Sequence, residues 1–505
     1  MKIAEILKQE EVLNHEGAPA FRMDKELELY SAVVTSALEN TYYEGSPERM
    51  RRIVNLVEKV DSLFVARLAV YARQVMNLRS IPLVLLVELA RIHNGDDLVS
   101  RAVAATVLRA DEIAELLMCY QWRNPTKGYK RLGSLSRGIQ NGLKLSFNRF
   151  DEYQFAKYAR DGQGVTLKDA LYLVHPKAKD AAQQLLFDKI AKDELAIPYT
   201  WETEFSAVGQ RVFSSPEEKK AAQKETWERL ILSGRLGYMA MLRNLRNILA
   251  AQVGEEAIAR VCATLSDPKE VARSRQMPFR FLSAYRELEN KAYKSSFAVK
   301  QALEAAVQAS AANITGFNHW TRVLLACDVS GSMRHPISRH SKVELYDIGL
   351  MMAMLLQKSC GKVLTGIFGS QWKLADMNRA EILSGTMSLR HYGNSVGFDT
   401  NGHLVIDYLL KNGIRMDKVL MFTDCQLWNS HGTGRLLAQS WQEYRHFCPN
   451  AQLYLFDLAG YGITPVRVKE DGVCLIAGWN DKVFDVLDAL ERGEDALSEI
   501  NKIVL

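Results

Sequence analysis

The chain has 505 residues, of which 48% are apolar and 24% are charged, and its formal net charge is +5. These values are ordinary for a folded protein and exclude collagen-like, mucin-like and wholly disordered chains. At about 100–200 residues per domain, the length predicts two to four domains.

From about residue 25 to 315 the sequence predicts helices almost throughout. Pro47 and Pro82 suit first helical turns, and short breaks rich in Gly, Asn, Asp or Pro separate the helices. Many short helices joined by short loops favour a solenoid of stacked helical pairs, although no strict repeat is visible. Apolar residues at three- and four-residue intervals predict helices at 25–40, 47–76, 82–92, 151–161, 167–174, 178–192, 216–232, 236–252, 254–264 and 296–312.

Basic residues gather in this helical half. Lys and Arg number 45 against 39 Asp and Glu over residues 1–318, whereas the counts are 19 and 20 over 319–505. Residues 123–149 contain seven basic residues and no acidic one. Such a segment can collect phosphates by releasing their counterions, and the alternative is an ordinary solvated cationic face.

From about residue 320 short, wholly apolar runs alternate with helical stretches. Buried parallel strands read as continuous apolar runs joined by crossover helices, so this part predicts a doubly wound α/β domain. Ligands of such sheets bind at the carboxyl ends of the strands. The predicted strands are 322–328, 362–369, 418–424, 452–458 and 472–478, with helices at 342–359, 401–412, 431–447 and 480–491.

Oxygen-bearing side chains follow two of these strands. Asp328, Ser330 and Ser332 stand at alternate positions after the first, Asp424 ends the third, and Thr400 enters a helix from the loop between them. Carboxylates and hydroxyls suit a hard cation, and Mg²⁺ is the cation we expect. The set resembles the metal-ion-dependent adhesion site of a von Willebrand factor A domain. The alternative is that Asp328 and the serines only cap the following helix.

A catalytic role for this site is disfavoured. A phosphoryl-transfer site of the DxD type needs a carboxylate where Ser330 stands, and the chain has neither a GxxxxGK[ST] nor a GxSxG motif. A nuclease would need more carboxylates to hold two metal ions. We therefore expect the chain to have no catalytic residue. We expect the metal ion instead to bind a carboxylate of another protein.

Apolar stretches, the N-terminal sequence and the cysteines indicate where in the cell the protein is expected. The longest nearly uncharged apolar stretch, 348–356, is far shorter than the ~20 residues of a membrane span. The acidic start lacks the features of a signal peptide, and seven scattered cysteines without CxxC spacing favour neither disulfides nor a zinc site. We expect a cytoplasmic protein that does not associate with membranes.

The order of these parts resembles the Ro autoantigen family, over about residues 16–505. The resemblance implies an all-α TROVE domain of HEAT-like repeats at 1–318, closed into a ring, followed by a von Willebrand factor A domain at 319–505. The short loop at 161–166 suggests a bacterial member. The stretches that carry the likeness are ARLAVYARQVMNLRSIPLVLLVEL at 66–89, FAKYARDGQGVTLKDALYLVHPKAKD at 155–180 and RVLLACDVSGSM at 322–333.

The family's known properties give the functional expectation. Members bind single-stranded 3′ ends of misfolded non-coding RNAs in a basic central channel and small Y RNAs on the outer surface. Bacterial relatives cooperate with the exoribonuclease polynucleotide phosphorylase. The resemblance thus implies an RNA-binding scaffold in RNA quality control, and a monomer is the default expectation for its oligomeric state. The alternative is a metal-dependent adaptor whose solenoid binds a protein or peptide, but the acid-free segment 123–149 favours RNA.

The resemblance also assigns residues. His175 is expected to stack on a base or donate to a phosphate, and the alternative is a helix-terminal histidine satisfied by backbone groups. The residues that match the family's RNA-binding segment are Lys157, Arg160, Lys168, His175 and Lys177. Those proposed mainly from charge, for contacts with phosphates, are Arg123, Lys130, Arg131, Arg137 and Lys144.

Some positions keep two interpretations. Tyr129 and Phe147 either stack on unpaired bases or belong to ordinary packing. Tyr71 and Arg79 either face the interior of the ring or hold helices together.

Three metal-site residues match the family motif residue for residue: Asp328, Ser330 and Ser332. Thr400 and Asp424 match less closely, because Thr386 and Ser395 offer other hydroxyls before the helix.

Overall fold

The computed structural model describes residues 9–36, 39–124, 135–158, 164–289, 293–310, 314, 317, 319–339, 341–376, 378 and 381–505. The chain divides into two compact units. The first comprises Met1–Met50 with Trp227–Glu499, and the second comprises Arg51–Thr226 with Ile500–Leu505. The predicted division at 318/319 follows the change from helices to strands and stays a prediction, as does closure of the helices into a ring.

The second unit is helical. In the described part α4 packs against α5 and α6, α5 against α7, and α6 against α8, which is the neighbour pattern of stacked helical repeats. Its helices include α4 (Ser62–Gln74), α5 (Ser80–Ile92), α6 (Leu98–Thr106), α7 (Ala110–Arg123), α8 (Arg137–Phe147), α9 (Glu152–Tyr158), α10 (Leu167–Val174), α11 (Ala181–Lys192) and α12 (Trp201–Gly209).

Two boundaries in this unit have clear physical reasons. The predicted helix 47–76 is two helices, α3 (Ser46–Val57) and α4, because Asp61 caps the second by accepting from the Phe64 N–H. The sequence did not predict α8, which contains Gly138 and Gly142. A Cβ at Gly142 would lie 2.5 Å from the Cβ of Val103, so this glycine allows α8 to approach α6 closely. Packing therefore overrides the low helix propensity of glycine.

The longer segment of the first unit, Trp227–Glu499, starts with a group of packed helices. α18 packs against α15, α16 and α17, and α17 in turn packs against α19 of the α/β part. These helices are α13 (Pro216–Leu232), which crosses the unit boundary, α14 (Tyr238–Ala250), α15 (Glu255–Ser266), α16 (Pro268–Ser274), α17 (Pro278–Glu287) and α18 (Ser296–Ser310).

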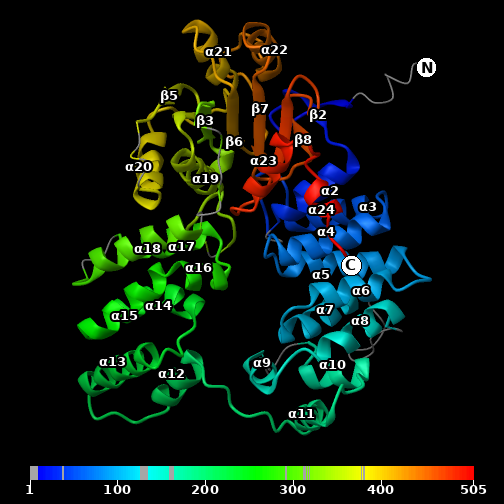
Figure 1. Ribbon diagram of the computed structural model, residues 1–505, viewed down its shortest axis with the longest axis vertical. Helices are drawn as coiled ribbons and strands as arrows, with labels where there is room; N and C mark the ends of the chain where they lie inside the picture. Colours follow the sequence, from blue (N-terminus) through cyan, green and yellow to red (C-terminus); the bar gives the residue numbers. More distant parts are fainter. Residues whose placement is uncertain are drawn as a thin grey trace. The chain divides into compact units, whose positions relative to one another are not determined.

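The α/β part contains a six-stranded sheet in the order β5-β4-β3-β6-β7-β9 (Figure 1). All neighbouring strands are parallel except β5, which is antiparallel to β4. The strands are β3 (Arg322–Asp328), β4 (Lys362–Phe368), β5 (Trp372–Leu374), β6 (Lys418–Thr423), β7 (Gln452–Asp457) and β9 (Val473–Ala477). The predicted fold class is confirmed, and the three-residue β5 is too short to leave a sequence signal.

Helices surround this sheet. α19 packs on β3, β4 and β6, α21 packs against α22, and α23 packs on β9. The bounds are α19 (Leu345–Ser359), α20 (Leu383–Gly393), α21 (His403–Lys411), α22 (Leu437–Phe447), α23 (Val483–Glu491) and α24 (Ser498–Asn501), with a short 3₁₀ helix η1 (Ser332–Arg334). Four of these helices fall where the sequence predicts them, whereas α20 and α24 were not predicted.

The N-terminal segment packs on the α/β part of its own unit. β1 (Glu11–Leu13) and β2 (Pro19–Arg22) form a hairpin, and β2 pairs with β8 (Ile463–Thr464) (Figure 1). In α2 (Lys25–Val34), Tyr30 Oη donates to the carbonyl of Ala477, at 3.1 Å. Ser31 Oγ donates to Asp457 Oδ2, at 2.6 Å. These buried bonds anchor the segment beside the sheet.

Two negative observations apply to the described part of the chain. None of its helices combines the length and apolar character that crossing a bilayer requires. All seven cysteines have free thiols.

Candidate functional site

Asp328 ends β3 and is held by two donors. The backbone N–H of Ser330 donates to Oδ1 at 2.9 Å, and the Thr423 hydroxyl donates to Oδ2 at 2.7 Å. Neither bond caps a helix, and the next α-helix starts only at Leu345, behind its own cap at Glu344. The carboxylate therefore belongs to the loop at the carboxyl end of the sheet, and the helix-capping interpretation does not describe it.

The other predicted ligands lie in the same cluster of loops. The hydroxyls of Ser330 and Ser332 are 3.3 Å apart. Thr400 Oγ1 donates to the carbonyl of Gln426 at 3.1 Å, and the N–H of Gln426 donates to Asp424 Oδ1 at 3.0 Å. All five predicted ligands are at most 4% exposed. The structure thus groups two carboxylates and three hydroxyls at one buried edge.

The two alternative hydroxyls are engaged elsewhere. Thr386 Oγ1 donates within α20 to the carbonyl of Ile382, at 2.7 Å. Ser395 Oγ accepts from Lys373 Nζ, at 3.3 Å. Of the three candidates, Thr400 is the one hydrogen-bonded to the Asp424 loop.

The electrostatics of the cluster favour binding of a cation. Burial raises the pKa of Asp328, while burial and the nearby Asp328 charge raise that of Asp424. The Ser332 hydroxyl lowers the pKa of Asp424 and so opposes this rise in part. Even so, Asp424 Oδ2 is buried and has no hydrogen-bond partner in the described part of the chain. A buried, unpartnered carboxylate oxygen is costly, and a divalent cation would compensate it.

The donor set fits Mg²⁺ chemically. Among the described residues no group of three or more His, Cys, Asp or Glu gathers at one place, so a site for a softer metal has no support there. Asp328, Ser330, Ser332, Thr400 and Asp424 would hold the ion. When bound, it would neutralise the two carboxylates and offer a coordination position to an oxygen ligand.

We expect Asp424→Asn to raise the melting temperature of the metal-free protein and to abolish any rise caused by Mg²⁺. Burial and the nearby Asp328 charge raise the pKa of Asp424 to about 7, so removing this carboxylate removes a charge that destabilises the metal-free fold. It also removes the ligand through which Mg²⁺ stabilises the folded state. Thermal melts in EDTA and in millimolar Mg²⁺ measure both effects. Asp376→Asn, at an exposed aspartate, is the control, and a Mg²⁺ response that survives in Asp424→Asn would contradict this metal site.

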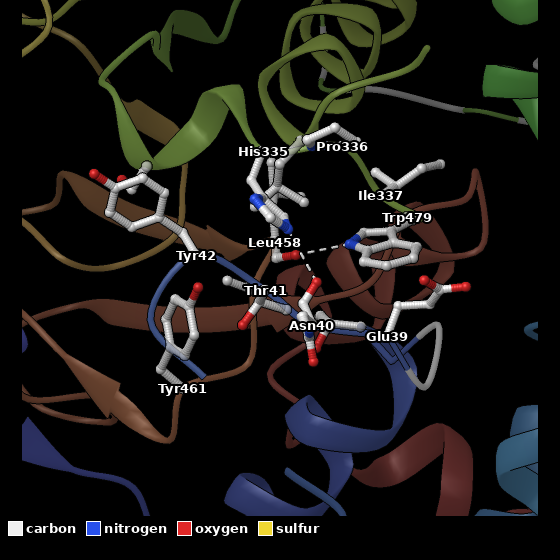
Figure 2. Close-up of a pocket in the computed structure, with 14 residues that line it drawn as sticks. Glu39, Asn40, Thr41, Tyr42, His335, Pro336, Ile337, Leu458, Tyr461 and Trp479 are labelled. Carbon is white, nitrogen blue, oxygen red and sulfur yellow. Dashed lines mark hydrogen bonds between the residues drawn. The ribbon is translucent and has the colours of Figure 1, made fainter. Parts of the chain in front are cut away.

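A small pocket adjoins the cluster at Ser332. It lies between residues 39–42 and the loop at 335–337, where His335 Nε2 is 3.0 Å from the Asn40 carbonyl oxygen (Figure 2). Trp479 Nε1 donates to the Leu458 carbonyl at 2.7 Å on the same wall (Figure 2). The pocket encloses about 20 Å³, room for about one water molecule and too little for a side chain.

Basic residues of the second unit form a strip along α8 and the segment after α10. Asn148 links the two: its Nδ2 donates to the Lys177 carbonyl at 2.9 Å, and its carbonyl accepts from Lys179 Nζ at 2.9 Å. Gln140 Nε2 donates to the Val174 carbonyl at 3.3 Å, beside His175. We call this the α8–α10 strip, and its members are Arg137, Lys144, His175, Lys177 and Lys179.

The strip carries uncompensated charge. Within the described part of the chain none of its four Lys and Arg residues forms an ion pair with an acidic residue. His175 ends α10 in the left-handed conformation, with φ of 49°, and its N–H bonds the Leu171 carbonyl at 3.0 Å. Its exposed ring makes no hydrogen bond to the described residues. Arg137 and Lys144 lie two turns apart, on one face of α8.

A second basic group combines with aromatic rings. Lys157 Nζ lies 5.7 Å from the Tyr153 ring centre and 5.6 Å from that of Tyr158, and Arg109 covers Tyr158 at 4.3 Å. Tyr153 is 46% exposed. The sequence interpretation omitted both tyrosines, although their i, i+4 and i, i+1 spacing to Lys157 was visible.

The remaining predicted residues are placed as follows. Lys168 Nζ pairs with Asp193 at 2.6 Å, which reduces the charge it offers to a phosphate. Phe147 is buried against Phe155 and Phe187, so it packs rather than stacks on bases. Lys130, Arg131, Arg160 and Tyr129 lie outside the described residues.

The two residues predicted to face a ring or to hold helices have structural contacts. Tyr71 is 1% exposed. Arg79 pairs with Asp111 at 2.8 Å and lies 3.8 Å from Glu115, so it joins the start of α5 to α7.

Comparison with curated proteins and family models gives partial matches. The TROVE domain model matches residues 194–354, and the Ro60 vWA domain model matches residues 322–490. Telomerase protein component 1 of Rattus norvegicus is 40% identical over 96 residues, 19% of this chain and 3% of that protein. The Mus musculus protein is 25% identical over 338 residues, 53% of this chain and 13% of that protein. The chain therefore spans only a small part of these relatives.

A solved structure supports the fold. The crystal structure of the Deinococcus radiodurans Ro (RSR) protein aligns with 93% of this chain and 100% of its own, at 18% identity and a TM-score of 0.58. The identity is low, so this likeness bears on the fold alone. The α8–α10 strip lies outside both family-model matches. The chain thus combines a match to the TROVE domain model with a match to the Ro60 vWA domain model, and it has the fold of a solved Ro protein.

Proposed function

We propose that this chain is an RNA-binding scaffold that acts in the quality control of non-coding RNA. The α8–α10 strip is the observation that carries the proposal: hydrogen bonds join α8 to residues 174–179, and the Lys and Arg residues of both segments have no acidic partners in the described part of the chain. A structural role would favour ion pairs, whereas a phosphate backbone supplies the missing anions.

The nearby aromatic group favours single-stranded RNA over duplex. Exposed Tyr153, with Lys157 above its ring, offers a surface on which an unpaired base can stack. Duplex RNA hides the faces of its bases, so this contact requires an unpaired segment. In line with the Ro family, we propose that the ligands are single-stranded 3′ ends of misfolded RNAs and Y-like RNAs, with an exoribonuclease such as polynucleotide phosphorylase as a partner.

The proposal is tested with two RNAs of equal charge, one a duplex with a single-stranded 3′ tail and the other a blunt duplex. We expect tail-dependent binding whose log affinity falls with log salt by about 0.7 per phosphate contact. Filter binding or fluorescence anisotropy at several salt concentrations gives both quantities. Equal and weak binding of the two RNAs would contradict the proposal.

A second function is supported by the unpartnered Asp424 oxygen. We propose that the metal centre binds a carboxylate of a partner protein, beside and not in place of RNA binding. The two functions use different residues, so Asp328→Ala should leave RNA affinity nearly unchanged. Loss of RNA binding in a folded Asp328→Ala protein would contradict this division.

A further inference from the structure

A polar pocket of about 270 Å³ lies in the helical part of the first unit. Its walls come from the turn between α13 and α14, from α15 and from α16, and α14, α15 and α16 pack against one another (Figure 1). The volume is near the lower end of the range for small-molecule sites, about 300–1,000 Å³. A water molecule takes about 30 Å³, so the pocket has room for a planar organic group rather than for one water or ion.

One wall of the pocket is apolar. Leu236 and Tyr238 are at most 8% exposed, and Tyr238 Oη donates to the Leu265 carbonyl at 2.8 Å. Gly234, in the turn before α14, has a φ of 69°, and a Cβ there would lie 3.9 Å from Arg260 Nη2. The glycine therefore keeps a side chain out of the space beside that guanidinium. An apolar wall with an aromatic ring suits the face of a planar heterocycle.

The wall formed by α15 places three polar side chains in a row. Arg260, Thr264 and Asp267 stand at positions i, i+4 and i+7 of this helix and its C-terminal cap, so they lie along one face. At 1.5 Å per residue, Arg260 and Asp267 start about 10 Å apart along the helix axis. The row therefore presents a donor at one end, an acceptor at the other and a hydroxyl between them.

This row has hydrogen-bonding capacity to spare. Among the described residues, the side chains of Arg260 and Thr264 form no ion pair and no hydrogen bond. Asp267 caps α16 through Oδ1, which accepts from the Lys269 N–H at 2.8 Å, and this leaves its Oδ2 without a partner in the same part of the chain. A guanidinium, a hydroxyl and a carboxylate oxygen are therefore available to a ligand.

Guanine is the nucleobase that matches this row. Its O6 and N7 accept two hydrogen bonds from one guanidinium, which suits Arg260. Its N1–H and amino group donate from the adjoining edge, which suits the carboxylate of Asp267. Adenine places an amino donor where guanine has O6, and uracil has no amino group. The order of donor and acceptor along α15 therefore favours guanine over the other bases.

We propose that this pocket binds a guanine base, with Arg260 on its O6 and N7 edge and Asp267 on its N1–H and amino edge. The base belongs either to a free guanine nucleotide or to an unpaired guanosine of an RNA, because both present the same edges. The pocket shares no residue with the α8–α10 strip or with the metal centre, so its test is independent of theirs.

The first test measures binding of the four nucleoside monophosphates to the full chain by isothermal titration calorimetry. We expect GMP to bind about 10- to 100-fold more tightly than AMP, CMP or UMP, which is the discrimination of one bidentate contact. Asp267→Asn should lose this preference and favour xanthosine monophosphate, because xanthine has a carbonyl in place of the amino group and an amide can donate to it. Arg260→Gln should weaken GMP binding about tenfold.

Asp24→Asn is the matched control. Asp24 also caps a helix of the first unit, by accepting from the Leu27 N–H at 2.9 Å, and it is no part of the pocket. Asparagine caps a helix about as well as aspartate, so both variants keep their helices. Equal binding of the four nucleotides, or an unchanged preference for GMP in a folded Asp267→Asn protein, overturns the proposal.

A second test distinguishes the two sources of the base. It compares a single-stranded RNA of adenosines with one central guanosine against an all-adenosine RNA of the same length, by fluorescence anisotropy. Tighter binding of the guanosine RNA, lost in Asp267→Asn and reversed by GMP, identifies an RNA base as the ligand. A preference for GMP without any difference between the two RNAs identifies the free nucleotide.

Discussion

Replacing Arg137, Lys144 and Lys177 together by glutamine is expected to weaken binding of a 3′-tailed RNA by about 30- to 100-fold at low salt. The reason is that three phosphate contacts are lost at once. The salt dependence should fall as well, by about 2 in the slope of log affinity against log salt, at about 0.7 per single-strand contact. Fluorescence anisotropy titrations at several salt concentrations give both numbers.

The control must change the net charge equally. Arg211, Lys219 and Lys220 offer one arginine and two lysines in the same unit, all exposed and away from the α8–α10 strip. Their triple glutamine variant should lose little affinity, because diffuse charge contributes weakly beyond about 10 Å at 0.1 M salt. If both triple variants weaken RNA binding alike, general positive charge and not the strip holds the RNA.

The folded structure also explains why the strip could be predicted only in part. Charge alone indicated the segment 123–149, but nothing in the sequence showed that Asn148 joins it to Lys177 and Lys179. The ion pair of Lys168 with Asp193 was equally invisible, because the partners are 25 residues apart. Local patterns report on single elements, and contacts between elements decide which charges remain free.

The metal centre shows the same limit. The motif from Asp328 to Ser332 is local and marks its own loop, and the strand pattern placed Asp424 at the same edge of the sheet. The contribution of Thr423, which donates to Asp328 at 2.7 Å, depends on strand pairing and was missed. The N-terminal hairpin, whose His15 N–H donates to Gln426 Oε1 at 3.0 Å, was missed because it comes some 400 residues earlier in the chain, where no pattern points toward the sheet.

A buried ion cluster inside the first unit supports the second large prediction. Asp347 in α19 is fully buried and accepts from Arg286 Nη1 of α17 at 2.6 Å. It also accepts from Arg390 Nη1 of α20 at 2.6 Å and from the N–H of Glu344 at 2.7 Å. Arg286 further donates to the Lys342 carbonyl at 3.1 Å. One carboxylate therefore joins a helix of the TROVE match to two helices of the α/β part.

Arg286→Met is expected to destabilise the first unit by about 3 kcal/mol, because breaking one side of a buried pair leaves charge without its partner. At about 2.1 cal/mol/K of unfolding entropy per residue, a unit of this size loses about 4–5 °C in melting temperature, followed by circular dichroism or differential scanning fluorimetry. Arg246→Gln breaks an exposed pair with Glu287, at 3.3 Å, and should shift the melt by less than about 2 °C. Arg390, whose side chain is 30% exposed, should matter less than Arg286, at 9%, because water compensates it more readily. Equal melts of Arg286→Met and Arg246→Gln would mean that apolar packing alone holds α17 on α19.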